Sequence, residues 1–357
     1  MENKKILFFN AVPMPHSILL HQKLVDAGYI IDFWYYKDLT NIYPWKKFNA
    51  PLKYNVFNNS FDHIKKVITS LFQSDLVIIT GWHTRFHVVL MFLSKLFGKR
   101  YALWLDASNE PINSFKKLRN ITLLRLSPLL FVTGEYGIKQ LNKQYGIAVN
   151  KMKDFPYLCA DFDSIKVREI NEKRKNDLLY GSKIKLLISN RFIERKGYNT
   201  IINAFSILPK EIINEFQITV LGTGLKFDKY KNELLNNITN IDFLGWVEYD
   251  TYLRCLTECD IFLHASLDEP FGIPPMDAMF CGKLVISSDG VVSSMSRIIN
   301  EINGFIYSKN DFHELASILS YLANNRWIIY QLGDKALETS KSYSYEYNIR
   351  SIQSALL

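Results

Sequence analysis

The chain lacks any apolar run close to the roughly 18 residues that a membrane-spanning helix needs, although 48% of its 357 residues are hydrophobic. Near the N-terminus, only four apolar residues follow Lys5 before Asn10, which is too few for the core of a signal peptide. The four cysteines have no CxxC spacing, which argues against a structural zinc site or a disulfide framework. These absences predict a globular, cytoplasmic protein whose cysteines are small buried residues.

Acidic residues are scarce in the first half of the chain and common in the second. Residues 1–165 hold 21 Lys and Arg against 12 Asp and Glu, whereas residues 166–357 hold 22 against 23. The net charge of +8 therefore lies wholly in the first half. This asymmetry predicts two domains with different partners, the first of which faces something anionic.

Short apolar segments alternate with helical patterns along both halves. Residues 75–83 (DLVIITGWH), 184–192 (IKLLISNRF) and 216–224 (FQITVLGTG) each begin with a buried strand pattern of about four to eight residues and end in a loop. Such segments are typical of parallel sheets covered by helices on both faces. We predict two α/β domains, at 1–165 and 166–340, with a charged linker around 160–182.

The residues that follow the predicted strands are the candidates for function. In open parallel sheets, ligands bind beyond the carboxyl ends of the strands. The side chains to watch at those ends are His16, His83, Asp106, Arg191, Gly222, Trp246 and Glu269.

One such loop is the stretch DEPFGIPPMDAMFCGK at residues 268–283. It follows the strand pattern IFLHASL and leads into a short helix. Glu269 lies at the start of the loop, and we expect Asp277 in the first turn of the helix. A helix N-terminus offers unpaired amide groups and a partial positive charge, which suit a phosphate. Gly272 lets the backbone approach a ligand closely.

The pattern E-P-F-G-I-P-P-M-D-A-M-x-x-G resembles the sugar-donor motif of retaining glycosyltransferases of family 4, the GT-B-fold group of glycosyl transferases group 1. Further segments agree with that family in order and spacing. They are SNRFIERKG at 189–197, ITVLGTG at 218–224, the stretch from Ile241 to Ser266, and INGFIYSKNDFHELASIL at 302–319. The resemblance covers roughly 180–330 and is weak in the first half.

The resemblance implies a GT-B fold, in which two Rossmann-like α/β/α domains have parallel sheets facing a central cleft. Residues 1–165 would bind the acceptor, and residues 166–340 would bind the nucleotide-sugar donor. A last helix at 341–357 would cross back to the N-terminal domain.

Carried over by position, the resemblance also implies roles for residues around the sugar donor. Glu269 would lie at the reacting sugar as the main catalytic group. Arg191 and Lys196 would bind the diphosphate, together with the backbone at Gly272 and Ile273. Charge-assisted contacts of that kind contribute about 1.5–3 kcal/mol each. Since these side chains supply positive charge themselves, we expect no metal and no cofactor.

Other positions depart from the family or are less specific. The family usually has Glu where this chain has Asp277, which would bind ribose with a shorter reach. Trp246 and Val247 would lie on the nucleobase side. In the first half, NAVPMPHS replaces a Gly-Gly turn, which leaves His16 as a contact for acceptor or sugar donor. Asp106 stands where many members have His, and we include it with His83 among the catalytic candidates.

Taken together, these features predict a retaining, metal-independent hexosyltransferase. It would move a sugar from UDP or GDP to a glycan or lipid-linked acceptor in bacterial surface polysaccharide synthesis. One alternative is a catalytically silent relative that binds a glycan or nucleotide sugar. Another is a nucleotide-sugar-modifying oxidoreductase, which the lack of a full dinucleotide fingerprint after residues 221–224 disfavours. The DFD at 161–163 matches a metal-binding D-x-D, but it opens the predicted linker.

Two basic segments of the first half are interleaved with apolar and aromatic residues. They are YPWKKFNAPLKY at 43–54 and NSFKKLRNITLLRLSPLLF at 113–131. Such mixtures suit the headgroup region of a membrane, so an anionic membrane surface is a predicted partner and the inner face of the plasma membrane a predicted location. A solvated basic loop is the plain alternative. Nucleic acid is not expected, because no recognised binding module is present. The cations concerned are Lys46, Lys47, Lys116, Lys117 and Arg119.

Overall fold

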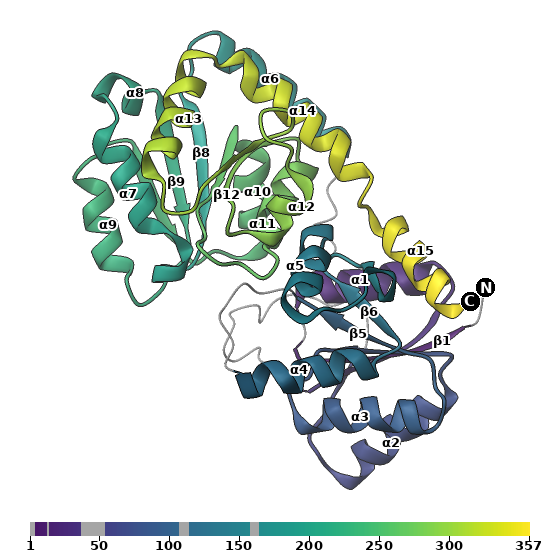
Figure 1. The fold of residues 1–357 in the computed structure, drawn as a ribbon. Coiled ribbons are helices and arrows are strands. Elements are labelled where there is room, and N and C mark those ends of the chain that lie inside the picture. The colour runs from purple at the N-terminus through teal and green to yellow at the C-terminus, as the bar shows by residue number, and fades with distance from the viewer. Residues whose placement is uncertain (1–3, 13, 37–53, 107–113, 158–163) are drawn as a thin grey trace. The chain divides into compact units, whose positions relative to one another are not determined.

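The computed structural model describes residues 4–12, 14–36, 54–106, 114–157 and 164–357, and the chain forms two compact units (Figure 1). The first comprises Met1–Leu158 together with Tyr343–Leu357, and the second comprises Cys159–Ser342. Within the described ranges, the structure has no helix long and apolar enough to span a bilayer.

The first unit is built on a seven-stranded parallel sheet. Its strand order is β3-β2-β1-β4-β5-β6-β7, so the direction of growth reverses between β1 and β4. The reversal matters because ligands of open parallel sheets bind beside such a point. The strands are β1 (Lys5–Asn10), β2 (Ile30–Tyr35), β3 (Asn55–Val56), β4 (Leu76–Thr80), β5 (Tyr101–Leu105), β6 (Leu129–Val132) and β7 (Met152–Asp154).

Alternate residues of these strands pack into two hydrophobic layers, one on each face of the sheet. In β1, Leu7 and Phe9 join one layer, whereas Ile6 and Phe8 join the other. This period of two, with both faces buried, explains why the strands are apolar throughout. The first layer is covered by α2 (Phe61–Gln73), α3 (Arg85–Leu96), α4 (Ser114–Leu126) and α5 (Glu135–Tyr145), and the second by α1 (Pro15–Asp26) and α15 (Tyr345–Leu356).

The C-terminal helix α15 is bonded to the first unit along its length. Ile352 is fully buried in the layer beside Phe8. The Asn348 side chain donates to the carbonyl of Pro156 at 2.8 Å, and Ser351 donates to the carbonyl of Asp154 at 3.2 Å. The last residues of the chain thus complete a core that begins at its N-terminus.

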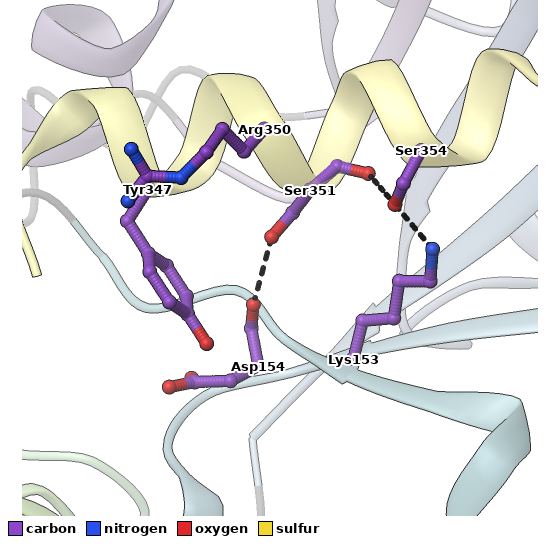
Figure 2. Close-up of a pocket in the computed structure, with 6 residues that line it drawn as sticks. All are labelled: Lys153, Asp154, Tyr347, Arg350, Ser351 and Ser354. Atoms are coloured by element: carbon purple, nitrogen blue, oxygen red, sulfur yellow. Dashed lines mark hydrogen bonds between the residues drawn. The ribbon is translucent and has the colours of Figure 1, made fainter.

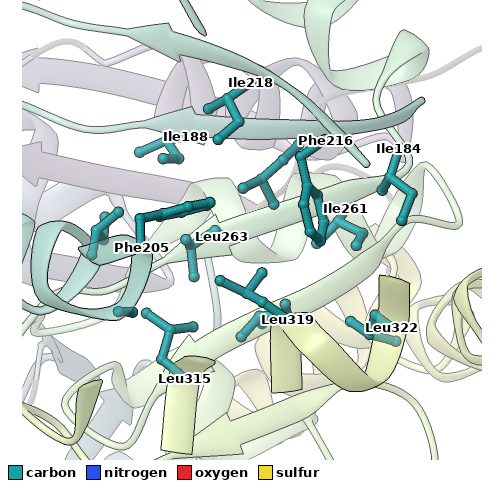
Figure 3. Packing of buried hydrophobic residues seen from close by; sticks show 14 of the residues in the cluster. Ile184, Ile188, Phe205, Phe216, Ile218, Ile261, Leu263, Leu315, Leu319 and Leu322 are labelled. Atoms are coloured by element: carbon teal, nitrogen blue, oxygen red, sulfur yellow. The ribbon is translucent and has the colours of Figure 1, made fainter. Parts of the chain in front are cut away.

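The second unit repeats the plan with a six-stranded parallel sheet. Its order is β10-β9-β8-β11-β12-β13, with the reversal between β8 and β11. Figure 3 shows Phe205, Leu315 and Leu319 from the covering helices against Ile188 and Leu263 of the sheet. The strands are β8 (Ile184–Ser189), β9 (Phe216–Leu221), β10 (Ile241–Gly245), β11 (Ile261–His264), β12 (Leu284–Ser288) and β13 (Phe305–Tyr307).

Helices cover both faces of this second sheet as well. α7 (Tyr198–Ile207), α9 (Phe227–Leu235) and α13 (Phe312–Asn324) contribute to the core cluster of Figure 3. The remaining helices of the unit are α6 (Ser164–Leu179), α8 (Lys210–Asn214), α10 (Tyr249–Glu258), α11 (Ile273–Phe280), α12 (Val292–Arg297) and α14 (Trp327–Lys341).

The predicted linker around 160–182 is wrong for most of its length. Residues 164–179 form α6, and Arg174 of this helix is buried against Asp260 at the start of β11. The guanidinium donates to both oxygens of Asp260, at 3.2 and 2.8 Å, and Tyr330 of α14 donates to the same carboxylate at 2.6 Å. A helix that looks charged and solvated in sequence is therefore fixed by a buried ion pair.

Candidate functional site

The loops after β8 and β11 meet at the reversal of strand order in the second unit. The two strands are hydrogen-bonded neighbours, with Ile261 opposite Leu186 and Leu263 opposite Ile188. Their carboxyl ends therefore emerge side by side, although they are separated by more than 70 positions in sequence. The first loop holds Arg191 and Lys196, and the second holds Glu269 and Gly272.

Glu269 and Lys196 form an ion pair at this point. The Lys196 ammonium contacts Oε2 of Glu269, and their side chains are only 11% and 16% exposed. His264, at the end of β11, lies with Nε2 3.9 Å from the same oxygen. The amide of Asn190 donates to His264 Nδ1 at 3.3 Å, which places the ring proton on Nε2, toward Ser266 and Glu269.

Burial and neighbouring charge together set the ionisation of Glu269, His264 and Lys196. Burial raises the pKa of the Glu269 carboxyl, but His264 and the charge of Lys196 outweigh it and lower that pKa to about 2. Burial lowers the pKa of His264, which favours a neutral ring. Burial also lowers the pKa of Lys196, and Glu269 partly opposes that shift. The site therefore holds a carboxylate, a lysine and a neutral imidazole.

Gly272 and the start of α11 lie directly after this carboxylate. Gly272 has φ of +92°, and a Cβ built there would lie 2.8 Å from Val291 Cγ1 and 3.2 Å from Glu269 Cγ. The loop is also held by α12, because the Ser293 hydroxyl donates to the Gly272 carbonyl at 2.6 Å. Ile273 is the first residue of α11, where the first amides of a helix lack intrahelical partners.

Two further glycines bring neighbouring loops together. Gly222 follows β9 with φ of +121°, and a Cβ there would lie 2.1 Å from the carbonyl oxygen of Asn190. A Cβ at Gly197 would lie 1.9 Å from the carbonyl oxygen of Ala265. The loops after β8, β9 and β11 can approach this closely only because neither position has a side chain.

Arg191 is exposed at the start of the loop after β8, next to the buried Asn190 and Phe192. The second arginine of that loop, Arg195, turns toward the loop after β11, where it donates to the Asp268 carbonyl at 2.9 Å. Lys196 and Arg191 therefore differ in accessibility: the lysine is paired and mostly buried, and the arginine faces solvent.

The structure corrects the expected position of Asp277. It is the fifth residue of α11, so it lies beyond the first turn. Its side chain is buried, and its Oδ2 accepts the hydroxyl of Tyr252 from α10 at 2.8 Å. Burial, and then the negative charge of Asp277, raise the pKa of Tyr252, so the phenol keeps its proton and donates. Tyr252 could not be found from sequence, because the two residues are 25 positions apart on different helices.

Trp246 and Val247 follow β10 and are both half-buried. They lie between the end of that strand and Tyr249, the first residue of α10. β10 is the edge strand of the sheet, two strands from β8.

In the first unit, a different group of side chains lies beyond β5 and β6. Asp106 accepts the hydroxyl of Thr133 at 3.0 Å and that of Tyr157 at 3.2 Å. The ring of Tyr157 in turn meets that of His16, edge to face, with centroids 4.5 Å apart. Two of the predicted contacts, His16 and Asp106, are thus joined through a tyrosine that the sequence did not single out. Desolvation by the surrounding protein lowers the pKa of His16 to about 3, so its ring is neutral.

His83 follows β4, the strand directly beside the reversal in this sheet. Its ring lies 5.9 Å from that of His87 on α3, which is fully buried and bonded through Nδ1 to the Thr84 hydroxyl at 2.7 Å. Burial lowers the pKa of His87 to about 3. His83 is exposed and is available to a ligand, whereas His87 is a core residue.

A surface cavity of about 290 Å³ lies between α15 and β7 (Figure 2). Its lining is polar, and its groups are largely bonded to one another. Ser351 donates to the Asp154 carbonyl, and Lys153 donates to Ser354. None of the predicted site residues lines it.

The part of the chain that the structure describes contains no cluster of three or more His, Cys, Asp or Glu side chains suited to a metal ion. The DFD at 161–163 lies outside the described residues.

The sequence of the second unit matches the model of a known family. Residues 169–341 match Glycosyl transferases group 1. The match spans nearly all of the second unit, and the predicted resemblance to that group is confirmed. Membership of family 4 within the group stays a prediction.

Related proteins share the same region. An uncharacterized glycosyltransferase of Methanocaldococcus jannaschii (MJ1178) is 28% identical over 169 residues, which cover 47% of this chain and 46% of that protein. The serotype-specific mannosyltransferase WbdA of Escherichia coli is 22% identical over 201 residues, covering 53% of this chain and 23% of that protein. The match thus spans about half of this chain and less than half of each relative.

Solved structures resemble the whole fold. Anabaena Alr3699/HepE, crystallised in complex with UDP, has a TM-score of 0.75 at 19% identity, and the match covers 98% of this chain and 99% of that one. Sucrose-phosphate synthase from Thermosynechococcus elongatus has a TM-score of 0.71 at 16% identity, with 98% of each chain covered. The predicted fold class, two parallel-sheet α/β domains of the GT-B type, is confirmed.

Proposed function

We propose that this glycosyltransferase moves a hexose from a nucleoside diphosphate sugar, UDP- or GDP-linked, to a glycan or lipid-linked acceptor, with retention at the anomeric carbon. The acceptor class proposed is a bacterial surface polysaccharide or its lipid-linked precursor. The mannosyltransferase relative and the UDP complex of Anabaena Alr3699/HepE support a nucleotide-sugar donor. The proposal includes a peripheral position at the inner face of the plasma membrane, where a lipid-linked acceptor would lie.

The observation that supports this function best is the Lys196–Glu269 pair beside Gly272 and the start of α11. A nucleoside diphosphate sugar needs positive charge at the diphosphate and a negative group near the anomeric carbon when that carbon becomes cationic. Lysine and carboxylate lie together here at the strand-order reversal, where α/β sheets bind ligands. In this proposal the charge of the diphosphate is balanced without a metal ion.

In this proposal one bond breaks and one forms at the anomeric carbon, and a proton moves from acceptor to phosphate. The bond between the anomeric carbon and the diphosphate oxygen breaks, and the acceptor oxygen bonds to that carbon on the same face. The departing phosphate takes the acceptor's proton, so no separate protein base is needed. Lys196, Arg191 and the amides at Gly272 and Ile273 stabilise the charge that develops on the diphosphate.

Glu269 then acts on the sugar and not on the proton. Its pKa of about 2 keeps it ionised at neutral pH, so it cannot serve as a general acid. An ionised carboxylate stabilises positive charge at the anomeric carbon and accepts hydrogen bonds from sugar hydroxyls. When the diphosphate draws Lys196 toward itself, Glu269 gains freedom to face the sugar.

The remaining positions are assigned by their place in the fold. Asp277, held by Tyr252, is proposed to contact the ribose, and the loop at Trp246 and Val247 to flank the base. In the first unit, His83 and the His16–Tyr157–Asp106 group are proposed to contact the acceptor or the transferred sugar.

Two other functions would use the same fold. A silent relative would bind a nucleotide sugar without cleaving it, and the ionised Glu269 at the site disfavours this. A nucleotide-sugar-modifying oxidoreductase would need a dinucleotide site, which residues 221–224 do not provide.

A thermal-shift screen across UDP- and GDP-sugars tests the proposal, because a ligand that binds the folded state raises its melting temperature by mass action. We expect one nucleotide sugar to stabilise the protein and to be slowly hydrolysed. Lys196→Gln should lose that stabilisation, whereas Lys173→Gln, an exposed cation of the same unit, should keep it. Stabilisation by dinucleotide cofactors alone would support the oxidoreductase instead.

Metal independence has its own test. Because side-chain cations and helix amides balance the diphosphate, we expect EDTA to leave the transfer rate unchanged. Loss of activity in EDTA that manganese restores would contradict this and point to the DFD at 161–163.

A further inference from the structure

The outer side of α3 presents an apolar stripe to solvent. Val89, Phe92 and Leu96 are spaced three and four residues apart, which places them on one side of the helix. Phe92 is 52% exposed and Leu96 is 75% exposed. Exposed apolar side chains are ordinary when scattered, but a continuous stripe marks an interaction surface.

Both neighbouring helices, which lie beside α3 on the same face of the sheet, also carry exposed apolar side chains (Figure 1). Phe97, just after α3, meets Phe72 of α2 with ring centroids 4.9 Å apart, and both remain about half exposed. On α4, Phe115 is 81% exposed. We call this surface the α2–α4 face; its apolar members are Phe72, Val89, Phe92, Leu96, Phe97, Phe115 and Leu118.

The same three helices are strongly basic. They contain eight Lys and Arg but a single acidic residue, Asp62, which is paired with Lys66 at 2.7 Å. Most of the first unit's positive excess therefore lies around the apolar stripe. The cations are Lys65, Lys66, Arg85, Lys95, Lys116, Lys117, Arg119 and Arg125, and all are exposed.

We propose that the α2–α4 face docks on an anionic lipid membrane. Its aromatic and leucine side chains would enter the boundary between headgroups and acyl chains, and its cations would meet lipid phosphates. A second copy of this chain is disfavoured, because two such faces would bring like charges together. The inference rests on the peripheral membrane position included in the proposed function and names the surface responsible, and it does not depend on which sugar is moved. It also extends the predicted membrane contact from 113–131 to α2 and α3, while 43–53 lies outside the described residues.

Sedimentation with vesicles tests this docking surface. We expect the full chain to bind vesicles of phosphatidylcholine mixed with phosphatidylglycerol, to bind vesicles of phosphatidylcholine alone poorly, and to be released by high salt. Replacing Lys116, Lys117 and Arg119 together with Gln should weaken binding about 100-fold, since each surface cation contributes roughly fivefold. The matched control is Arg168, Lys173 and Lys183 to Gln in the second unit, which should leave binding unchanged.

The contribution of the apolar residues of the α2–α4 face can be tested with a variant and a matched control. Leu96 and Leu235 are each the last residue of a helix and exposed, one on α3 and one on α9. Leu96→Gln, combined with Phe92→Ser, should weaken vesicle binding by about tenfold or more, whereas Leu235→Gln should not.

Three results would overturn the proposal. Vesicle binding that is absent at low salt would do so, and so would binding that the α3 and α4 variants leave intact. If the Leu96 and Phe92 changes instead convert a dimer into a monomer, the face is an interface between copies of the chain. Nucleoside diphosphate binding, measured by calorimetry without vesicles, should be normal in every variant, so failure of the docking surface and failure of the proposed reaction can be told apart.

Discussion

The two units share a parallel sheet whose strand order reverses beside its first strand, yet they differ in what surrounds that reversal. In the second unit, glycines draw the loops against one another, and a nearly buried ion pair lies between them. In the first unit, the corresponding loops present histidine, tyrosine and aspartate at partly exposed positions. This difference is what the proposed function requires: a diphosphate needs fixed backbone and charge, whereas a variable acceptor needs only suitably placed side chains.

The two units also differ in net charge and in where their charged side chains lie. The second unit is close to neutral, and its charged residues include buried pairs such as Arg174 with Asp260. The first unit is basic, and its cations lie on the outer sides of α2, α3 and α4. The second unit thus holds part of its charge in internal ion pairs, whereas the first unit displays its charge on the surface.

We expect the largest effect confined to one unit from Ile352→Ala, which should destabilise the first unit. Ile352 is fully buried in the first unit, so its truncation should lower that unit's free energy of unfolding by about 2–5 kcal/mol. Chemical denaturation measures this, with the partly buried Ile349→Ala as a milder control. Nucleoside diphosphate affinity should stay normal, and a parallel loss of that affinity would show that the units depend on each other.

Glu269→Gln should reduce turnover by roughly 100-fold or more while changing the sugar-donor Kd little, because the lost charge acts mainly in the transition state. Asp268→Asn is the matched control, since Asp268 neighbours Glu269 but is paired with Arg195. Steady-state kinetics and calorimetry decide the case. A variant with normal turnover and weaker binding would refute the assigned role.

Asp277→Ala should weaken nucleoside diphosphate binding by about 1–3 kcal/mol, the contribution of a charged hydrogen bond. Pyrophosphate, which has no ribose, should bind as before, and calorimetry with both ligands separates the two contributions. Tyr252→Phe keeps the carboxylate and should cost less. Equal losses for both ligands would mean that Asp277 only supports the structure of α11 through Tyr252.

Mild acid should destabilise the first unit through its buried histidines. His87 has a pKa near 3 when folded and 6.5 when unfolded, so the unfolded chain binds the proton first as pH falls. Its stabilising effect is complete above pH 6.5 and is lost progressively below it, by about 1.4 kcal/mol one unit lower. Denaturation at pH 7 and about pH 5.5 measures the slope, which His87→Asn should flatten. An unchanged slope would exclude His87 as a source of acid sensitivity.

Sequence alone placed the candidate residues of the second unit near one another because they lie in short local segments. The loop after β8, the glycine after β9 and the E-P-F-G stretch each occupy a few consecutive residues, and the strand-end rule places them on one edge of the sheet. The same reasoning missed His264, although it ends a strand, because its neighbours in sequence are apolar. It misjudged Asp277 by assuming that α11 begins later than Ile273.

What sequence determined by itself was the class of fold and the family that the second domain resembles, because period-two apolar strands, helix stops and a contiguous motif are properties of short segments. Only the tertiary structure decided which distant residues meet. It paired Lys196 with Glu269, Tyr252 with Asp277 and Tyr157 with Asp106, and it turned the charged segment at 164–179 into a packed helix. The physical reason is that a hydrogen bond or ion pair between separate elements depends on how those elements pack, and packing uses the whole hydrophobic core at once.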